Sequence, residues 1–338
     1  MRRALKVEAD LLTWLLESEN PSARYLALTE VLDRTSDDPE VTAARAAIPG
    51  VDPARAILEA QFAGSGPVSG PAGYWVKPDV GYSPKYRATV WQVIFLAQLG
   101  APPIEPVRRA CDYVLDRSRR LTDGRGDPDG RFVAGRGARA TVNCLNGNLL
   151  WALRRLGCGE DPRAVEARQA TARAILERGY ACYYNGELPC AWGDVKALRA
   201  FLEVPVEARS ADVIAAIERG VELLLSAPLL EATYPTASRV SERWFQLGFP
   251  LGYHADVLEA MLALVQAGHG DHPYVQAGVE WLLAKQDTRG RWTLEQVPGK
   301  MWASFGRIGR PNKWVTLRAT ELLRAIGGLS RATLGVGM

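Results

Sequence analysis

The stretch PLGYHADVLEAMLALVQAG, residues 250–268, decides the predicted fold. It opens with polar and aromatic residues, continues as a long apolar body and stops at a glycine, the common C-cap of a helix. Four other stretches repeat the polar start and the apolar body, at residues 86–100, 141–157, 190–204 and 313–328, and three of them also end at a glycine. Their apolar residues recur at helical spacing, and no stretch shows the period of two that indicates a strand.

Amphipathic stretches alternate with these apolar ones. They carry one apolar stripe and many charges, which is typical of helices on the outside of a protein. They occupy residues 104–118, 162–179, 210–226 and 273–286. Successive apolar stretches begin roughly 50 to 60 residues apart, a period that indicates stacked helix pairs.

N-terminal helices add a sixth pair and are predicted near residues 8–17, 21–34, 38–47 and 52–62. Six pairs can close into a ring, and an open solenoid is the other arrangement. We predict closure, because the inner helices are apolar nearly all round. The predicted fold is all-α, a single (α/α)6 toroid domain over residues 1–338 with a central apolar cavity. Residues 1–62 complete the ring, and residues 63–338 supply five helix pairs.

Composition argues against nucleic acid and membranes as partners. The chain has 41 basic and 38 acidic residues and a net charge of +3, without a dense basic stripe. No apolar run reaches the ~18 residues that a membrane span needs. The start, MRRALKVEADLL, lacks the apolar region of a signal peptide. We therefore expect a cytoplasmic protein.

Several stretches resemble the terpenoid cyclase and protein prenyltransferase superfamily of α/α toroids. LLAKQDTRGRW (282–292) is similar to its Gln-to-Trp repeat, and ILEAQ with GYW (57–75) is a looser copy. KWVTLRA (313–319) and SPKYRATVWQ (83–92) resemble a little-studied prenyltransferase- or squalene-cyclase-like branch. The resemblance covers nearly the whole chain and implies the toroid fold and a hydrophobic, isoprenoid-like substrate, while fold alone does not fix the reaction.

In a ring of parallel inner helices, all helix N-termini share one opening. Their partial positive charge and free N–H groups favour anions and thiolates. Tyr253, His254 and Asp256 are expected there, in the first turns of one apolar helix. A loop adds Lys85 to the residues expected at this opening. Residues predicted to bind substrate at this opening are Tyr86, Arg87, Asn146, Asn148, Asp194, Trp244, Lys313 and Trp314.

A zinc site is one interpretation of this opening. Cys144, Cys182, Cys190 and His254 carry the thiolate and imidazole groups that zinc prefers. ELPCAWGDVKAL resembles the segment with the zinc cysteine of prenyltransferase β subunits, and GYHADVLEAM the segment with their zinc histidine. The resemblance implies Cys190 and His254 as ligands. The family's aspartate ligand is replaced here by Leu188, so Cys144 or Cys182 would complete the site. Such transferases need a partner subunit, and the sequence identifies none.

Acid–base chemistry without metal is the second interpretation. Asp79, Tyr82, Tyr253, His254 and Asp256 can supply a proton donor and an acceptor in a partly dry pocket. A cysteine pair that includes Cys182 can also protonate or attack a substrate carbon. Such a site resembles that of linalool dehydratase-isomerase in architecture, which implies a lyase or isomerase.

A non-catalytic hydrophobic-ligand-binding or scaffold protein is the third interpretation. Buried thiols and helix-capping carboxylates account for the same residues without any chemistry. The remaining cysteines, Cys111 and Cys158, are expected to be structural. The acidic stretches GDPDGR (126–131) and SDDPEV (36–41) lack the last aspartate of the motifs that terpene cyclases use, which disfavours long-chain cyclisation.

Overall fold

The computed structural model describes residues 2–63, 73–76, 81–117, 130–135, 141–237 and 240–327. These residues form thirteen α-helices, and their β pairing is limited to isolated bridges. The predicted all-α class is therefore confirmed. The α-helices are α1 (Arg2–Leu15), α2 (Pro21–Leu26), α3 (Pro39–Ala47), α4 (Ala54–Ala63), α5 (Thr89–Gln98), α6 (Glu105–Arg117), α7 (Asn143–Arg155), α8 (Pro162–Arg178), α9 (Ala191–Leu202), α10 (Ala211–Leu225), α11 (Val257–Gln266), α12 (Pro273–Ala284) and α13 (Lys313–Ala325).

Short helical turns extend or connect these helices. A π-helical turn, η1 (Ala27–Val31), continues α2 directly. The 3₁₀ turns are η2 (Ile48–Gly50), η3 (Tyr183–Asn185), η4 (Val206–Ala208) and η5 (Glu242–Phe245). Together α2 and η1 cover most of the helix predicted at 21–34, so this N-terminal segment also matches the sequence pattern.

The start of α11 differs from the sequence prediction. We expected the helix from residue 250, but it begins at Val257, where the Asp256 side chain accepts from the Glu259 N–H at 2.8 Å. The preceding loop is fixed to α5, because the Gln98 amide bonds both the N–H and the C=O of Leu251, at 2.7 and 2.8 Å. Tyr253 therefore lies in a loop ahead of the helix, not in its first turn.

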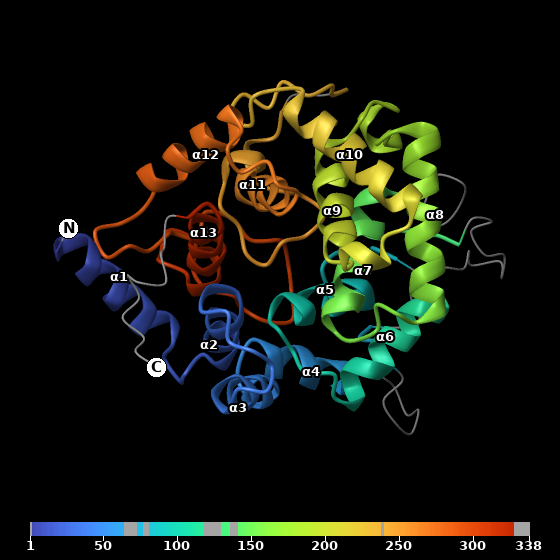
Figure 1. The fold of residues 1–338 in the computed structure, drawn as a ribbon. Helices are drawn as coiled ribbons and strands as arrows, with labels where there is room; N and C mark the ends of the chain where they lie inside the picture. The colour runs from blue at the N-terminus through green and yellow to red at the C-terminus, as the bar shows by residue number, and fades with distance from the viewer. Residues whose placement is uncertain are drawn as a thin grey trace.

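The apolar helices contact one another in the order of the chain. α5 contacts α7, α7 contacts α9, α9 contacts α11, α11 contacts α13, and α13 contacts α2 and η1. Ser22 of α2 joins both ends of this series: its Oγ donates to Leu99 O at 2.8 Å and accepts from Trp314 Nε1 at 3.1 Å. Figure 1 shows these helices around the middle of the molecule, with the amphipathic α6, α8, α10 and α12 toward the outside.

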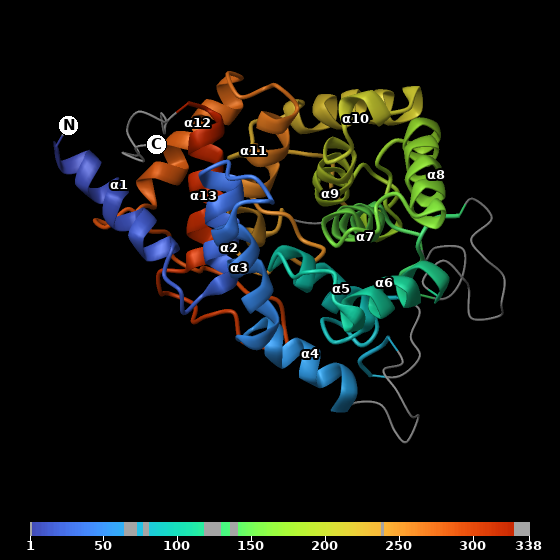
Figure 2. The ribbon, with the colours of Figure 1, turned by 60° about the horizontal axis from the view of Figure 1, so that its bottom comes forward.

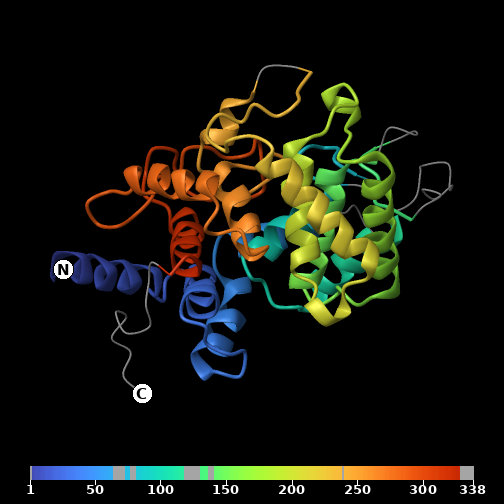
Figure 3. The same cartoon turned by 45° about the horizontal axis from the view of Figure 1, so that its top comes forward.

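The first and last helices of the chain are neighbours. Figures 2 and 3 show α1 on the same side of the molecule as α12 and α13. Lys313, at the start of α13, pairs with Glu17 just after α1 at 2.8 Å. The Lys313 ammonium also lies 5.5 Å from the ring of Trp14.

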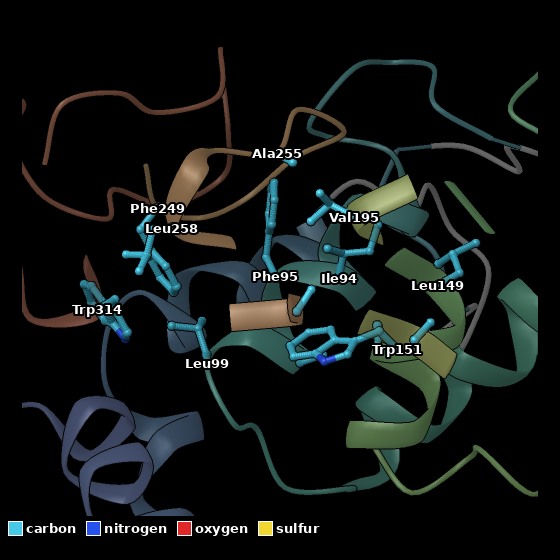
Figure 4. Packing of buried hydrophobic residues seen from close by; sticks show 14 of the residues in the cluster. Ile94, Phe95, Leu99, Leu149, Trp151, Val195, Phe249, Ala255, Leu258 and Trp314 are labelled. Carbon is cyan, nitrogen blue, oxygen red and sulfur yellow. The ribbon is translucent and has the colours of Figure 1, made fainter. Parts of the chain in front are cut away.

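One hydrophobic cluster connects the described helices, from Leu11 in α1 to Leu322 in α13. Figure 4 shows side chains of α5, α7, α9, α11 and α13 meeting in a shared interior. The closest approach between helices depends on Gly147 of α7. A Cβ there would lie 2.2 Å from the backbone carbonyl carbon of Lys196 in α9, so only glycine permits this distance.

Buried ion pairs link α9, α11 and α13 within the core. Lys196 Nζ and Arg199 Nη1 each lie 2.6 Å from Glu259, and Arg318 Nη2 lies 2.6 Å from Asp256. Lys196, Glu259 and Asp256 are almost completely buried. Removing one member of such a pair leaves an uncompensated charge in a region without water, which is strongly destabilising.

A small pocket of about 80 Å³ lies among the apolar helices, and α2 and all five apolar helices contribute to it. One residue from each is Leu26, Ala97, Trp151, Arg199, Leu262 and Leu317. Its walls also include the charged side chains of Glu30, Arg155 and Glu321. The larger and more apolar pocket lies elsewhere, at the N-terminal ends of α7 and α9.

Candidate functional site

The larger pocket has a volume of about 530 Å³, within the ~300–1,000 Å³ range of small-molecule sites. Its walls come from the loop before α5, the start of α7, the segment that leads into α9, the loop around η5 and the loop before α11. The residues are Tyr82, Ser83, Lys85, Ala134, Val142, Cys144, Cys182, Tyr184, Asn185, Cys190, Ala191, Trp192, Ala232, Tyr234, Pro235, Thr236, Val240, Ser241, Trp244 and Tyr253.

A tight turn places Cys182 beside Cys190. Cys190 N donates to Tyr180 O at 2.9 Å, and Cys182 N donates to Leu188 O at 3.1 Å, so the chain doubles back on itself. Gly186 sits in the left-handed region, φ 64°, where the turn reverses. Cys190 is then the N-cap residue of α9.

The two thiols have very different pKa values. Hydrogen bonding from Cys190 lowers the pKa of Cys182 to about 6; burial opposes this, and the backbone N–H groups of Tyr184 and Asn185 reinforce it. The same hydrogen bond, together with burial, raises the pKa of Cys190 far above its usual value. At neutral pH Cys182 is a thiolate and Cys190 holds the proton.

A third thiol faces the same pocket from α7. Burial raises the pKa of Cys144 to about 11, so it stays protonated. Its Sγ lies 3.3 Å from Tyr82 Oη, and burial raises the pKa of that phenol as well. Tyr82 is held in place by stacking on Trp91 at 4.5 Å and by the bond from Trp91 Nε1 to its carbonyl, 3.0 Å.

Tyr253 stands at the centre of an aromatic group. Lys85 Nζ donates to Tyr253 Oη at 2.6 Å and lies 4.2 Å from the ring centroid. The Tyr86 ring stacks parallel to Tyr253 at 6.4 Å. Tyr86 has a φ of 64°, a strained conformation for a tyrosine that surrounding contacts must enforce. Its ring packs against Gly252, where an added Cβ would lie only 3.0 Å from the ring, and reaches ordinary contact distance from Gly299.

His254 lies next to the pocket but does not line it. Its ring meets the edge of Trp192 at 4.5 Å, and Arg243 Nη1 donates to its Nδ1 at 3.4 Å. Burial, followed by the charges of Arg243, Lys85 and Lys196, lowers its pKa to about 3. His254 is therefore neutral at pH 7, with its proton on Nε2.

Asp256 and Asp194 are both buried in the core, and their surroundings shift the pKa values of the two carboxyls in opposite directions. Asp256 accepts from Gly248 N at 3.1 Å in addition to its helix cap. Burial opposes its ionisation, but the Arg318 charge and these bonds outweigh it and hold its pKa below the usual value. Asp194 faces Tyr180 and Gly220 inside the structure, and burial raises its pKa well above the usual value. Neither carboxyl lines the pocket.

The predicted substrate-binding residues are dispersed over the structure. Trp244 lines the pocket, and its Nε1 donates to Leu229 O at 2.8 Å. Asn146 bonds both backbone groups of Phe132, at 2.8 and 3.0 Å. Asn148 donates to Gly252 O at 3.0 Å. All three therefore hold loops against the helices.

The other predicted residues lie away from the pocket lining. The Arg87 guanidinium covers the Trp302 ring at 3.7 Å. Lys313 pairs with Glu17, and Trp314 stacks on Phe249 at 5.1 Å. Asp79 lies outside the described residues.

A metal ion needs a closer set of ligands than the described side chains provide. Among them, no group of three or more His, Cys, Asp or Glu side chains could hold a metal ion. The three thiols line one pocket, but His254 presents its Nδ1 to the Arg243 guanidinium. We therefore derive no chemical step through zinc.

Sequence reasoning did not identify several pocket residues. Tyr184 and Asn185 lie between the two cysteines in ACYYNGELPC, so their place could be inferred from that turn. Tyr234 comes from the irregular segment before α11, where helical periodicity gives no information.

Comparisons with known proteins leave the chain without an assigned family: no family model matches it, and a search of curated proteins finds no match. No helix in the described ranges is long and apolar enough to cross a membrane.

Proposed function

We propose that this chain is an enzyme acting on a small hydrophobic, isoprenoid-like molecule, with cysteines as its base and acid. The observation that carries the proposal is that Cys182 and Cys144 line one pocket, in surroundings that lower the pKa of the first thiol and raise the pKa of the second. Titratable groups whose environments separate their pKa values are typical of general acid–base sites.

The fold proposed for this enzyme is the closed (α/α)6 toroid. The contacts of the apolar helices run in sequence from α5 to α13 and return to α2. Ser22 supports closure because it bonds both Leu99, at the end of α5, and Trp314, at the start of α13. The small pocket lined by α2 and the five apolar helices is the expected remnant of a central axis.

The proposed reaction is a dehydration or an isomerisation of an allylic substrate. Cys182 takes a proton from carbon, and Cys144, hydrogen-bonded with Tyr82, gives one to the departing hydroxyl or to the far carbon of the allyl system. The substrate either loses water or shifts its double bond, and both reactions proceed without an oxidant or a reductant. The catalytic state returns when the proton on Cys182 passes back to Cys144.

The pocket walls suit an apolar body. Trp192, Trp244 and Tyr234 supply aromatic faces, which bind apolar chains and stabilise developing positive charge. No Asp or Glu is among the described residues that line the pocket. A thiolate is thus the strongest base available to a bound substrate there.

The test is turnover of a panel of allylic alcohols and prenyl compounds. Replacing Cys182 or Cys144 by serine is expected to lower kcat by roughly 100-fold or more, while Cys158→Ser, on a connecting loop outside the pocket, leaves it unchanged. Turnover that survives both pocket substitutions would refute the thiol mechanism. Tight binding of apolar compounds without any turnover would favour the non-catalytic interpretation.

A zinc-dependent reaction is a second candidate because Cys144, Cys182 and Cys190 line the same pocket, although the described side chains do not form a group close enough to hold a metal ion. The arrangement of His254 beside Arg243 gives it less support. It stays a prediction that metal analysis of the purified protein tests.

A further inference from the structure

At one side of the thiol pocket lie two cations that have no carboxylate partner among the described residues. Lys85 lines the pocket, and Arg243, between the lining residues Ser241 and Trp244, contacts His254. Neither cation forms an ion pair with a carboxylate of the described chain. Both charges reach His254, whose pKa they lower together with burial. Two cations without a carboxylate partner in the described part of the chain, beside a small-molecule pocket, indicate an anionic group on the ligand.

The Lys85 ammonium is arranged to donate into the pocket. It has three N–H protons, and Tyr253 Oη accepts one of them at 2.6 Å. The Tyr253 hydroxyl, which also shares a hydrogen bond with Tyr86, can donate its own proton to an acceptor beside Lys85. Lys85 and Tyr253 therefore present adjacent donors, which suit the two oxygens of a carboxylate.

We propose that the ligand of this pocket is an amphipathic monocarboxylate, an apolar body with a carboxylate head held by Lys85 and Tyr253. The proposal rests on the proposed function and adds the class of substrate to it. The apolar body lies against the aromatic walls formed by Trp192, Tyr234 and Trp244. A neutral alcohol of the same length would leave the ammonium without its partner.

The charge of the site favours a carboxylate over a phosphate ester. A phosphate monoester carries about −1.5 to −2 at pH 7, and a diphosphate needs several cations or a metal ion to bind. Among the described lining residues, Lys85 is the one fixed cation. Because Cys182, a thiolate at neutral pH, lines the same pocket, the cations Lys85 and Arg243 together leave one positive charge for the ligand, and a monocarboxylate matches it.

The head-group site is adjacent to the proposed acid. The ring of Tyr82, whose hydroxyl contacts Cys144, lies 6.1 Å from the ring of Tyr253. A carboxylate at Tyr253 would therefore fix the neighbouring carbons of the substrate next to the thiol. Such positioning is how a remote binding group contributes to catalysis.

Binding of four ten-carbon probes tests the proposal: decanoate, decanol, decylamine and decyl phosphate, followed by calorimetry and by tryptophan fluorescence. Decanoate is expected to bind at least about tenfold more tightly than decanol, because it gains a charged hydrogen bond. Lys85→Met should remove this preference and leave decanol affinity unchanged. Lys300→Met, at an exposed lysine outside the pocket lining, should retain the preference.

Each alternative result has a separate meaning. Equal affinity for decanoate and decanol would overturn the head-group proposal and leave the thiol enzyme in place. Tighter binding of decyl phosphate than of decanoate would overturn the claim of a single charge. Binding of none of the four probes would remove both the carboxylate and the hydrophobic-substrate proposals. Loss of the decanoate preference in Lys300→Met would show that the effect is general electrostatics and overturn the Lys85 site.

Discussion

Replacing Cys190 by alanine is expected to raise the pKa of Cys182 and to slow its reaction with disulfide reagents in weak acid. Cys190 donates the hydrogen bond that holds the pKa of Cys182 at about 6, against about 8.5 for an ordinary cysteine. Alanine removes this donor and leaves only the backbone N–H groups of Tyr184 and Asn185. Serine keeps an O–H donor at the same place, so Cys190→Ser is the matched control.

The size of the pKa shift of Cys182 determines the pH at which its reaction rate with the disulfide reagent distinguishes the variants. At pH 7 a pKa of about 6 gives ~90% thiolate and a pKa of about 8.5 gives ~3%, a ratio of ~30. The less basic thiolate is also the weaker nucleophile, and a Brønsted coefficient of ~0.4–0.5 reduces its rate about tenfold. The net advantage at pH 7 is therefore only ~3-fold. At pH 5.5 the ratio of ionised fractions rises to ~240, and the net advantage to ~20-fold.

The assay measures the rate of reaction with dithiodipyridine from pH 4.5 to 9. Cys111 and Cys158 are first replaced by alanine, because hydrogen bonding from Cys111 also lowers the pKa of Cys158. Cys144 stays silent in this range, since burial keeps its pKa at about 11. We expect midpoints near 6 for the parent and for Cys190→Ser, and a clearly higher one for Cys190→Ala. A midpoint for Cys182 that Cys190→Ala leaves unchanged would refute the assigned hydrogen bond.

The remaining predictions concern stability and metal content. Gly147→Ala should lower the free energy of unfolding by about 2 kcal/mol, because the added Cβ has no room against α9. Gly50→Ala is the control, since the space around its Cβ is open, and it should unfold like the parent. Equal loss of stability in both variants would contradict the close packing of α7 and α9. Asp256→Asn should cost ~3–5 kcal/mol at pH 7 by leaving Arg318 uncompensated. The folded pKa of Asp256 is lowered, so its contribution is present above the unfolded pKa of ~3.9 and is lost as pH falls through the folded value. In denaturant melts, the difference in unfolding free energy between the two proteins should therefore stay constant from pH 7 to about 4 and narrow only below that. If the zinc interpretation holds, metal analysis of the purified protein finds zinc, and the Cys190→Ala variant loses it. Less than about a tenth of an equivalent of zinc would exclude this interpretation.

The helices of this fold were predictable because their signals are local. The stretch 141–157 contains α7 and the stretch 190–204 contains α9, each within a few residues at either end. Apolar residues at helical spacing and terminal glycines are sufficient to find such elements. The start of α11 was missed for a non-local reason: Gln98, far away in the chain, bonds Leu251 and keeps that segment out of the helix. No periodicity within residues 250–268 carries this information.

The candidate site shows the same division between local and distant causes. The proximity of Cys182 and Cys190 follows from the short turn between them, and a sequence reader can expect it. The unequal sharing of their proton cannot be read in this way, because it depends on which thiol is more deeply enclosed by other segments. The sequence places Lys85 at the same opening as Tyr253, but the hydrogen bond between its ammonium and the Tyr253 hydroxyl depends on two loops far apart in the chain. The chemistry of this pocket therefore follows from contacts between loops, while the helices that carry those loops follow from the sequence itself.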